Sequence, residues 1–339
     1  MAETVLVTGG TGYIAGWCLA GLLQQGYDVR TSLRSLAKEP ALRAALSGQG
    51  IDHTRLTCFA ADLTRDEGWS AAMAGCDYVL HVASPLGLDA PQHLEDMVAP
   101  ARDGTLRVLR AATHAGVRRV VMTSAATVAT PPLQSPDSLS DESVWFDPKE
   151  THVTPYRHAK RQAERAAWDF MHKQTGPITL TTVLPGAVFG PIMSADTLGS
   201  VQVIARLLQG RAKGNPRLGF EVVDVRDLAA LHIRVMTASA AAGQRLLGVG
   251  QFLWMAEISQ ILRDHLGDAA NKVPSRNIPD WLLRLLARFD PLLRGLTPNL
   301  GRQHRHTAEK ARVMLGWEPR PSSETLIDCA NSLIAHKVV

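Results

Sequence analysis

The sequence predicts an α/β protein built around a doubly wound parallel sheet, and three observations support this fold class. Short apolar runs alternate with amphipathic stretches through the first half of the chain, as in successive βαβ units. A glycine cluster follows the first apolar run directly, as it does in dinucleotide-binding sheets. The length of 339 residues also allows one large domain and a smaller lobe. We therefore expect a Rossmann-type sheet of about seven strands and a small mixed α/β C-terminal lobe.

Each expected element has its own signal. The strands are short apolar runs, the pattern of parallel strands that are buried on both faces. They are expected at 4–7, 27–33, 55–60, 78–83, 117–123 and 178–184. The helices carry apolar residues at helical spacing, and a glycine closes the first two. They are expected at 13–24, 91–115 and 155–173.

The alternation decays after residue 185, which suggests two parts. Residues 1–185 are expected to form the nucleotide-binding domain, to which part of 220–245 returns. Residues 186–339 are expected to form most of the substrate-binding lobe. Within it, 281–289 is amphipathic, and we interpret this helix as packing one face on the lobe rather than lying on a membrane.

Composition and charge exclude several classes of protein. The chain has 36 Lys and Arg against 32 Asp and Glu, a net charge of only +4, so no nucleic-acid partner is expected. Hydrophobic residues make up 45%, which excludes wholesale disorder. The 4 cysteines form no C-x-x-C pair, so neither a metal site nor a disulfide framework is expected. The absence of a signal peptide and of a long apolar run predicts a cytoplasmic protein with no membrane partner.

The glycine cluster at 8–16 reads T-G-G-T-G-Y-I-A-G and opens the first helix. Gly9 would allow the tight turn and Gly12 the close approach of backbone to a pyrophosphate. The N–H groups at the helix start would face the phosphates. The alternative is a glycine-rich turn that binds no ligand. The candidate cofactor-binding residues in this segment are Gly9, Thr11, Gly12, Tyr13 and Ile14.

The ends of the second and third strands predict the adenosine end of the site. An NAD enzyme usually carries an acid about 20 residues past the glycines, and none is present here. Arg34 could instead pair with a 2′-phosphate, with Lys38 or Arg43 as a second cation, which favours NADP. The alternative is that Arg34 is a solvated surface charge. Asp62 could accept from the adenine amino group while Leu63 packs on the ring, or Asp62 could simply cap a helix.

Tyr156 and Lys160 are the strongest candidates for catalysis. Residues four apart on a helix share a face, so the phenol and the ammonium would point the same way. A phenol with a pKa of about 10 is a poor acid–base group at neutral pH, and a nearby lysine cation would lower that pKa. Tyr156 could then protonate a carbonyl oxygen as hydride arrives.

These motifs together resemble the extended short-chain dehydrogenase/reductases, and among them the dihydroflavonol-4-reductase-like aldehyde and ketone reductases. Further matching segments are 81–85, 104–105, 123–124, 184–186 and 188–191. The resemblance implies an NADP(H)-preferring Rossmann domain, a Ser–Tyr–Lys site with Lys160 on the ribose hydroxyls, and a variable substrate lobe. It further implies that the cofactor runs along Val82, Ala83, Ser84, Pro185, Gly186 and Val188.

One position departs from the family pattern. Family members commonly read T-S-S at the end of the fifth strand, and the second serine usually orients the carbonyl. Here the segment reads Thr123-Ser124-Ala125, so alanine stands at the expected position. Either Ser124 takes the role after a local shift, or Thr127 does, or Tyr156 acts without a hydroxyl partner. We list Ser124, Tyr156 and Lys160 as the catalytic set.

The predicted function is therefore NADPH-dependent reduction of a small-molecule aldehyde or ketone to an alcohol. The alternatives are a nucleotide-sugar epimerase or dehydratase, a 3β-hydroxysteroid-type dehydrogenase, and a catalytically silent NADP-sensing protein. His81 ends a buried strand and is expected to be a core histidine with its hydrogen bonds satisfied. Substrate specificity is expected in 86–96, 131–146, 186–220 and 275–305, and the protein is expected to be a monomer or a homodimer.

Overall fold

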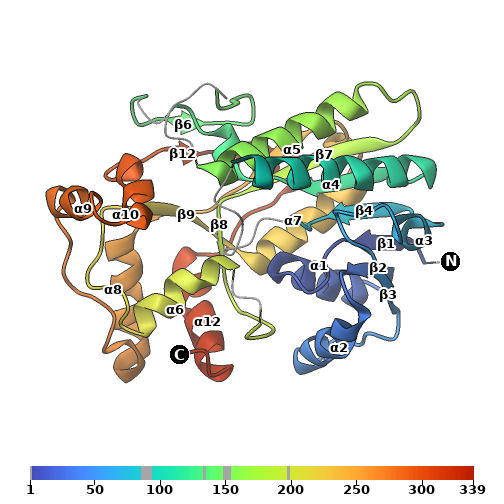
Figure 1. Ribbon diagram of the computed structural model, residues 1–339. Helices are drawn as coiled ribbons and strands as arrows, with labels where there is room; N and C mark the ends of the chain where they lie inside the picture. Colours follow the sequence, from blue (N-terminus) through green and yellow to red (C-terminus); the bar gives the residue numbers. More distant parts are fainter. Residues whose placement is uncertain (1, 85–93, 133–134, 148–153, 197–198) are drawn as a thin grey trace.

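A seven-stranded parallel sheet forms the centre of the molecule (Figure 1). The computed structural model describes residues 2–84, 94–132, 135–147, 154–196 and 199–339. The strand order is β10-β7-β5-β4-β1-β2-β3, and all neighbours are parallel. The strands are β1 (Thr4–Val7), β2 (Asp28–Leu33), β3 (Leu56–Ala60), β4 (Tyr78–His81), β5 (Arg119–Thr123), β7 (Thr179–Pro185) and β10 (Arg245–Gly248). The doubly wound fold class is confirmed.

The order of the strands reverses at β1. The chain first builds outward through β2 to β3 and then returns to place β4 on the other side of β1. In such sheets the connections after the two central strands leave to opposite faces, and a crevice opens at their carboxyl ends. The glycine cluster follows β1, and residues 82–84 follow β4, so the topology brings both to this crevice.

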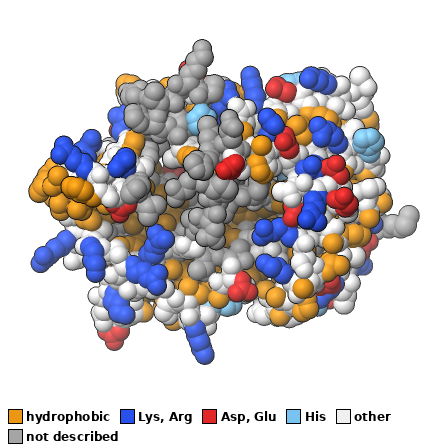
Figure 2. All heavy atoms as spheres, in the orientation of Figure 1, with side chains coloured by type: hydrophobic (Ala, Val, Ile, Leu, Met, Phe, Trp, Pro, Cys, Tyr) orange, Lys and Arg blue, Asp and Glu red, His pale blue; other side chains and the backbone are white. Residues whose placement is uncertain are grey.

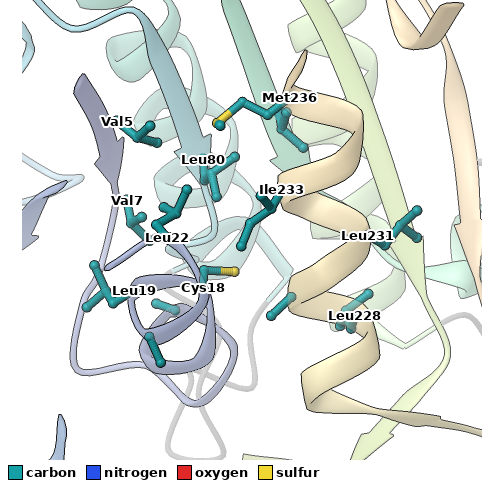
Figure 3. Packing of buried hydrophobic residues seen from close by; sticks show 14 of the residues in the cluster. Val5, Val7, Cys18, Leu19, Leu22, Leu80, Leu228, Leu231, Ile233 and Met236 are labelled. Atoms are coloured by element: carbon teal, nitrogen blue, oxygen red, sulfur yellow. The ribbon is translucent and has the colours of Figure 1, made fainter. Parts of the chain in front are cut away.

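Helices cover both faces of the sheet. On one face lie α1 (Tyr13–Gln24), α2 (Glu39–Gly48) and α7 (Val225–Thr237), and on the other lie α3 (Trp69–Met73), α4 (Leu94–His114) and α5 (Pro155–Met171). Figure 3 shows Cys18 and Leu22 of α1 pointing toward Ile233 of α7, next to Leu80 of β4. The helix α7 and the strand β10 thus return to the first sheet from late in the sequence.

The second part of the chain forms a smaller lobe with its own apolar core. A three-stranded sheet pairs β8 (Ala187–Phe189) in parallel with β9 (Gly219–Asp224), and β9 antiparallel with β11 (Phe252–Trp254). The helices packed on it are α6 (Gln202–Leu208), α8 (Met255–Leu266) and α12 (Ser322–Ala335). The remaining elements are β6 (Leu139–Ser140), which pairs with β12 (Arg305–His306), and α9 (Asp280–Leu286), α10 (Pro291–Leu296) and α11 (Glu309–Leu315).

The end of the fourth strand and the packing of one helix need correction. The fourth strand ends at His81 rather than at residue 83. The helix expected at 91–115 is described over Leu94–His114, and residues 91–93 lie outside the described residues. The helix near 281–289 packs less than expected. Only Leu283 and Ala287, one turn apart, are buried in that segment, whereas Phe289 is 83% exposed. A helix of two turns has one narrow buried seam, so its other apolar side chains reach the surface, where Figure 2 shows them beside arginines.

Three further findings concern the chain as a whole. Within the described ranges, no helix is long and apolar enough to cross a membrane. Cys18, Cys58, Cys76 and Cys329 are all free thiols. Across the described residues, His, Cys, Asp and Glu side chains nowhere gather in the groups of three or more that could hold a metal ion.

Candidate active site

The glycine loop after β1 is held from both sides. Gly9 has a φ of +72°, in the left-handed region that favours glycine, and a Cβ there would lie 2.9 Å from the Cβ of Ala83. The Gly9 N–H donates to Ser32 Oγ (2.9 Å), and the Gly10 N–H donates to the Ser32 carbonyl (3.1 Å). The Ala83 N–H donates to Thr8 Oγ1 (2.9 Å). The loop therefore has one conformation, fixed between the ends of β2 and β4.

The start of α1 presents its N–H groups without a side-chain cap. Gly12 is the N-cap residue in an extended conformation, and the first turn holds no acidic residue. Such an end attracts anions, because the first N–H groups of a helix lack carbonyl partners and carry the positive end of the dipole. The side chain of Tyr13 turns away, since its hydroxyl donates to the Gly190 carbonyl (2.8 Å). Ile14 is half-buried against the core, and Thr11 is exposed.

A cavity of about 370 Å³ opens beside this loop. Its walls come from the glycine loop, from the segment around α2 and from 193–196. Lys38, the last residue of a short 3-10 helix (Leu36–Lys38), lines it together with Gly10 and Gly12. The full lining is Gly10, Thr11, Gly12, Tyr13, Gly16, Lys38, Ala41, Leu42, Ala45, Met193, Ser194 and Asp196. The fold thus brings one of the two predicted second cations to the glycine loop.

The other predicted second cation is used elsewhere. Arg43 donates through Nε to Glu39 (2.8 Å), through Nη1 to the His53 carbonyl (3.1 Å) and through Nη2 to the Leu56 carbonyl (2.9 Å). These bonds tie α2 to the start of β3. The expectation that Arg43 could bind a phosphate is therefore wrong, because its guanidinium already holds the backbone.

Arg34 and Asp62 lie just past the carboxyl ends of β2 and β3. Arg34 is exposed directly after β2, and its charge helps to hold the pKa of Asp62 below its usual value. The larger cause is Thr64, whose N–H and hydroxyl both donate to Asp62 Oδ1 at 2.8 Å. Leu63 packs close to Gly104, where a Cβ would come within 2.9 Å of it. Asp62 is thus an ionised acceptor at the edge where an adenine would lie.

The helix α5 carries Tyr156 and Lys160 near its start. Thr154 caps the helix by accepting from the Arg157 N–H (3.3 Å), and Pro155 occupies the first helical position. Arg157 also donates through Nε to the Thr127 carbonyl (2.8 Å), which ties the helix to the segment after β5. Tyr156 is 40% exposed, and Lys160 is buried with its Nζ donating to the Thr123 carbonyl (3.3 Å).

The pKa values of this pair differ from the expectation. Although 40% of the Tyr156 residue surface is exposed, loss of water around its phenol group raises the pKa of Tyr156 to about 12, so the expected lowering by Lys160 is wrong for this state of the protein. The physical reason is that this loss of water disfavours the charged form, the phenolate. Burial also lowers the pKa of Lys160 to about 8, and the Glu164 carboxylate opposes that change. Tyr156 is thus a neutral hydroxyl at pH 7, the form that can donate a proton.

Ser124 does not face the crevice. Its hydroxyl donates to Glu164 Oε2 (2.6 Å) and the residue is 1% exposed. The expectation that Ser124 orients a carbonyl is at odds with this geometry, because the hydroxyl proton is already committed inside the protein. Ala125 is buried and has no hydroxyl, whereas Thr127 is exposed in the 3-10 turn Ala126–Ala129.

His81 is a core histidine, as expected. Its Nδ1 lies 3.0 Å from Thr8 Oγ1 and its Nε2 lies 3.3 Å from Thr105 Oγ1. Thr105 donates onward to the Ala101 carbonyl (2.9 Å), and Thr8 already accepts from Ala83, so Thr8 donates to a neutral ring that is protonated at Nε2. Burial lowers the pKa of His81 to about 3, in agreement with this neutral form. The imidazole links the ends of β1 and β4 to α4.

The residues that the family resemblance placed along the cofactor lie at strand ends. Val82 and Ala83 are half-buried and Ser84 is exposed, directly after β4, while the Pro85 of that motif is outside the described residues. Pro185 ends β7, and the Gly186 N–H donates to the Gly248 carbonyl (3.1 Å). Val188 is buried in β8. Of the expected specificity segments, most of 86–96 also falls outside the described residues.

Glu164 was not among the predicted site residues, although it lies in the same helix as Tyr156 and Lys160. Its signal in the sequence is the spacing, since an acid stands four residues after Lys160. The structure also adds Ser32, which holds Gly9, and Met193, which lines the cavity. Neither of these two has a local signal, because each contact joins distant segments.

The comparison with protein families decides the membership of the chain. The model of the NAD dependent epimerase/dehydratase family matches residues 5–250, most of the chain. The chain belongs to this family. The match covers the parallel sheet, the glycine loop, and Tyr156 and Lys160, in agreement with the resemblance to the extended short-chain dehydrogenase/reductases.

Family members with curated names include several reductases. The chain is 38% identical to cinnamoyl-CoA reductase 1 of Arabidopsis thaliana over 250 residues, which is 72% of this chain and 70% of that protein. It is 32% identical to the ketoreductase azaE of Aspergillus niger over 306 residues, 86% of this chain and 90% of the other.

Several solved structures share the whole architecture of this chain. The yeast methylglyoxal/isovaleraldehyde reductase Gre2, crystallised with NADPH, superimposes with a TM-score of 0.81 at 24% identity over 99% of this chain and 100% of the other. MoeE5, solved with UDP-glucose and NAD, gives 0.73 at 18% identity over 98% and 99%. Because these neighbours were solved with different ligands, proteins that bind different ligands share this fold.

Proposed function

We propose that this protein is an NADPH-dependent carbonyl reductase that converts an aldehyde or ketone to the alcohol. The observation that carries the proposal is the position of Tyr156 and Lys160 on one face of α5, where Lys160 Nζ donates to the Thr123 carbonyl at the carboxyl end of β5. The relatives that match 72% and 86% of the chain are named as reductases, which favours reduction over sugar epimerisation or dehydration.

The residues at the crevice fit NADP(H). The uncapped start of α1 would receive the pyrophosphate through the N–H groups after Gly12. Arg34 and Lys38 would bind the 2′-phosphate, since one is exposed after β2 and the other lines the cavity at the glycine loop. Asp62 would accept from the adenine amino group. When bound, NADPH supplies the hydride that reduces the carbonyl carbon.

Tyr156 supplies the proton in this mechanism. The carbonyl oxygen gains negative charge as its carbon is reduced, and the neutral Tyr156 hydroxyl donates its proton to that oxygen. Lys160 holds the ribose hydroxyls, and its positive charge stabilises the tyrosinate that remains. Because Ser124 is committed to Glu164, the exposed Thr127 is the hydroxyl that we assign to orient the carbonyl oxygen.

A screen of NADPH oxidation tests the proposal. Purified protein would be mixed with NADPH and with aliphatic, aromatic and bulky bicyclic carbonyl compounds, and absorbance loss would be followed together with formation of the alcohol. We expect turnover with at least one class. Binding of NADPH without turnover on any carbonyl would favour a sensing protein, and tightly retained NAD with turnover of a nucleotide sugar would favour an epimerase.

A further inference from the structure

A buried carboxylate extends the line of Tyr156 and Lys160 along α5. Glu164 is four residues after Lys160 and is fully buried. Side chains at this spacing lie on one face of a helix, with Cβ atoms about 6 Å apart. A buried carboxylate needs hydrogen-bond donors to stay ionised, so its partners decide what it can do to its neighbours.

Four donors from four separate elements surround this carboxylate. Ser124 donates to Oε2 (2.6 Å), while Thr182 Oγ1 (2.8 Å), Arg245 Nε (2.9 Å) and Trp168 Nε1 (3.4 Å) donate to Oε1. They come from the end of β5, from β7, from β10 and from α5 itself. Four donors, one of them the Arg245 guanidinium, thus hold the two oxygens of Glu164 in a single orientation.

Lys160 lies between the reacting end of α5 and this anion. Lys160 Nζ donates to the carbonyl of Thr123, the residue just before Ser124. Tyr156 on the same helix is a neutral phenol, and His81 on β4 and His232 on α7, which contacts Thr123 Oγ1, are both neutral because burial holds their pKa values low.

The charges near Lys160 are thus those of Glu164 and, beyond it, of Arg245. Burial lowers the pKa of Lys160, and the Glu164 carboxylate acts in the opposite direction. Arg245 is the ion-pair partner of Glu164, and its guanidinium also lies over the ring of Trp145.

We propose that Glu164 is a positioning residue of the active site, which holds Lys160 as an ammonium at neutral pH and fixes the end of β5 through the hydroxyl of Ser124. The functional part of this inference rests on the proposed reductase function. It explains why Ser124 is turned away from the crevice: its hydroxyl serves the carboxylate that sustains the charge of Lys160.

The test is a direct titration of Lys160 in the full-length protein. Lysine labelled with ¹³C at Cε gives one NMR signal per residue, and the signal of Lys160 is identified by its loss in Lys160→Met. In Glu164→Gln, the midpoint of this titration should fall by about one pH unit or more, the size expected on removing an adjacent opposite charge. The alkaline limb of kcat/KM for carbonyl reduction should move down with it.

Glu142→Gln is the matched control. Glu142 is also buried, and its carboxylate accepts from the Leu247 N–H (2.9 Å) while its carbonyl accepts from Arg245. The Glu142→Gln variant loses one negative charge next to the same arginine, yet the midpoint of the Lys160 titration should not change. An unchanged midpoint in Glu164→Gln, or an equal change in both variants, would overturn the proposal.

Glu164→Asp keeps the inference testable if the glutamine variant does not fold. The aspartate keeps the negative charge, but its side chain is one methylene shorter, so the charge lies farther from Lys160. The midpoint of the Lys160 titration should therefore fall, but by less than in a variant without the charge. An unchanged titration would contradict the proposal. NMR follows the lysine without any substrate, so it separates this inference from the reductase function. If the Lys160 midpoint falls in Glu164→Gln but the unmodified protein reduces no carbonyl, only the reductase function is refuted.

Discussion

Removal of the Arg34 guanidinium should abolish much of the preference for NADPH. The adenosine 2′-phosphate carries close to two negative charges, and charge-assisted hydrogen bonds contribute about 1.5–3 kcal/mol each. Arg34 is exposed, so solvent screens it and one such bond is the appropriate measure. That range corresponds to a roughly ten- to hundredfold preference for NADPH over NADH. Lys38 lines the same cavity as the glycine loop, so it should contribute a second bond to the phosphate. The preference for NADPH over NADH should therefore fall by about tenfold in Arg34→Ala and by about a hundredfold when Lys38→Ala is added.

The assay compares the two cofactors in each variant. Dissociation constants from fluorescence titration and kcat/KM with one carbonyl substrate would be measured for NADPH and NADH. The NADH values should barely change, since NADH has no phosphate to lose. Arg65→Ala is the control, because Arg65 is also exposed and also lowers the pKa of Asp62, but stands after β3. Equal efficiency with both cofactors in the unmodified protein, or an equal loss in the Arg65 variant, would refute the assignment.

Three other perturbations test the rest of the site. Tyr156→Phe should keep NADPH affinity but lower turnover by roughly 10²–10⁴, and near-normal rates would exclude it as the proton donor. Thr127→Val should lower kcat by about 10²-fold, as expected for one donor at a developing oxyanion, whereas Ser124→Ala should chiefly lower the melting temperature. If Ser124→Ala lowers kcat more than Thr127→Val does, Ser124 is the residue that orients the carbonyl oxygen. Gly10→Ala should destabilise the fold by about 1–3 kcal/mol, because its Cβ would lie 2.3 Å from Thr31 Oγ1, and calorimetry should show partial rescue when Thr31→Ala is added.

The fold class and the shared helix face of Tyr156 and Lys160 could be predicted from sequence because their signals are local. A buried parallel strand is a short apolar run, and a tight turn before a helix needs glycine whatever surrounds it. Tyr156 and Lys160 share a helix face through their spacing alone. These features depend on neighbours within a few residues, so a single chain displays them. The family resemblance added the strand ends that meet at the crevice.

The partners of individual side chains depended on tertiary structure. Ser124 and Arg43 both had functional interpretations, yet one donates to Glu164 and the other holds the backbone of 53–56. The pKa of Tyr156 likewise rises instead of falling, because the surrounding residues remove water from the phenol group.

The sequence by itself thus determined the sheet, the phosphate-binding turn and the Tyr–Lys spacing. Only the tertiary structure decided which hydroxyl is exposed and which charge sustains Lys160. The donors to Glu164 come from β5, β7, β10 and α5, and they converge only after those strands pair in the order β5-β7-β10. Hydrogen bonding and desolvation depend on atoms a few ångströms away in space, which here belong to segments up to 121 residues apart in the chain, from Ser124 to Arg245.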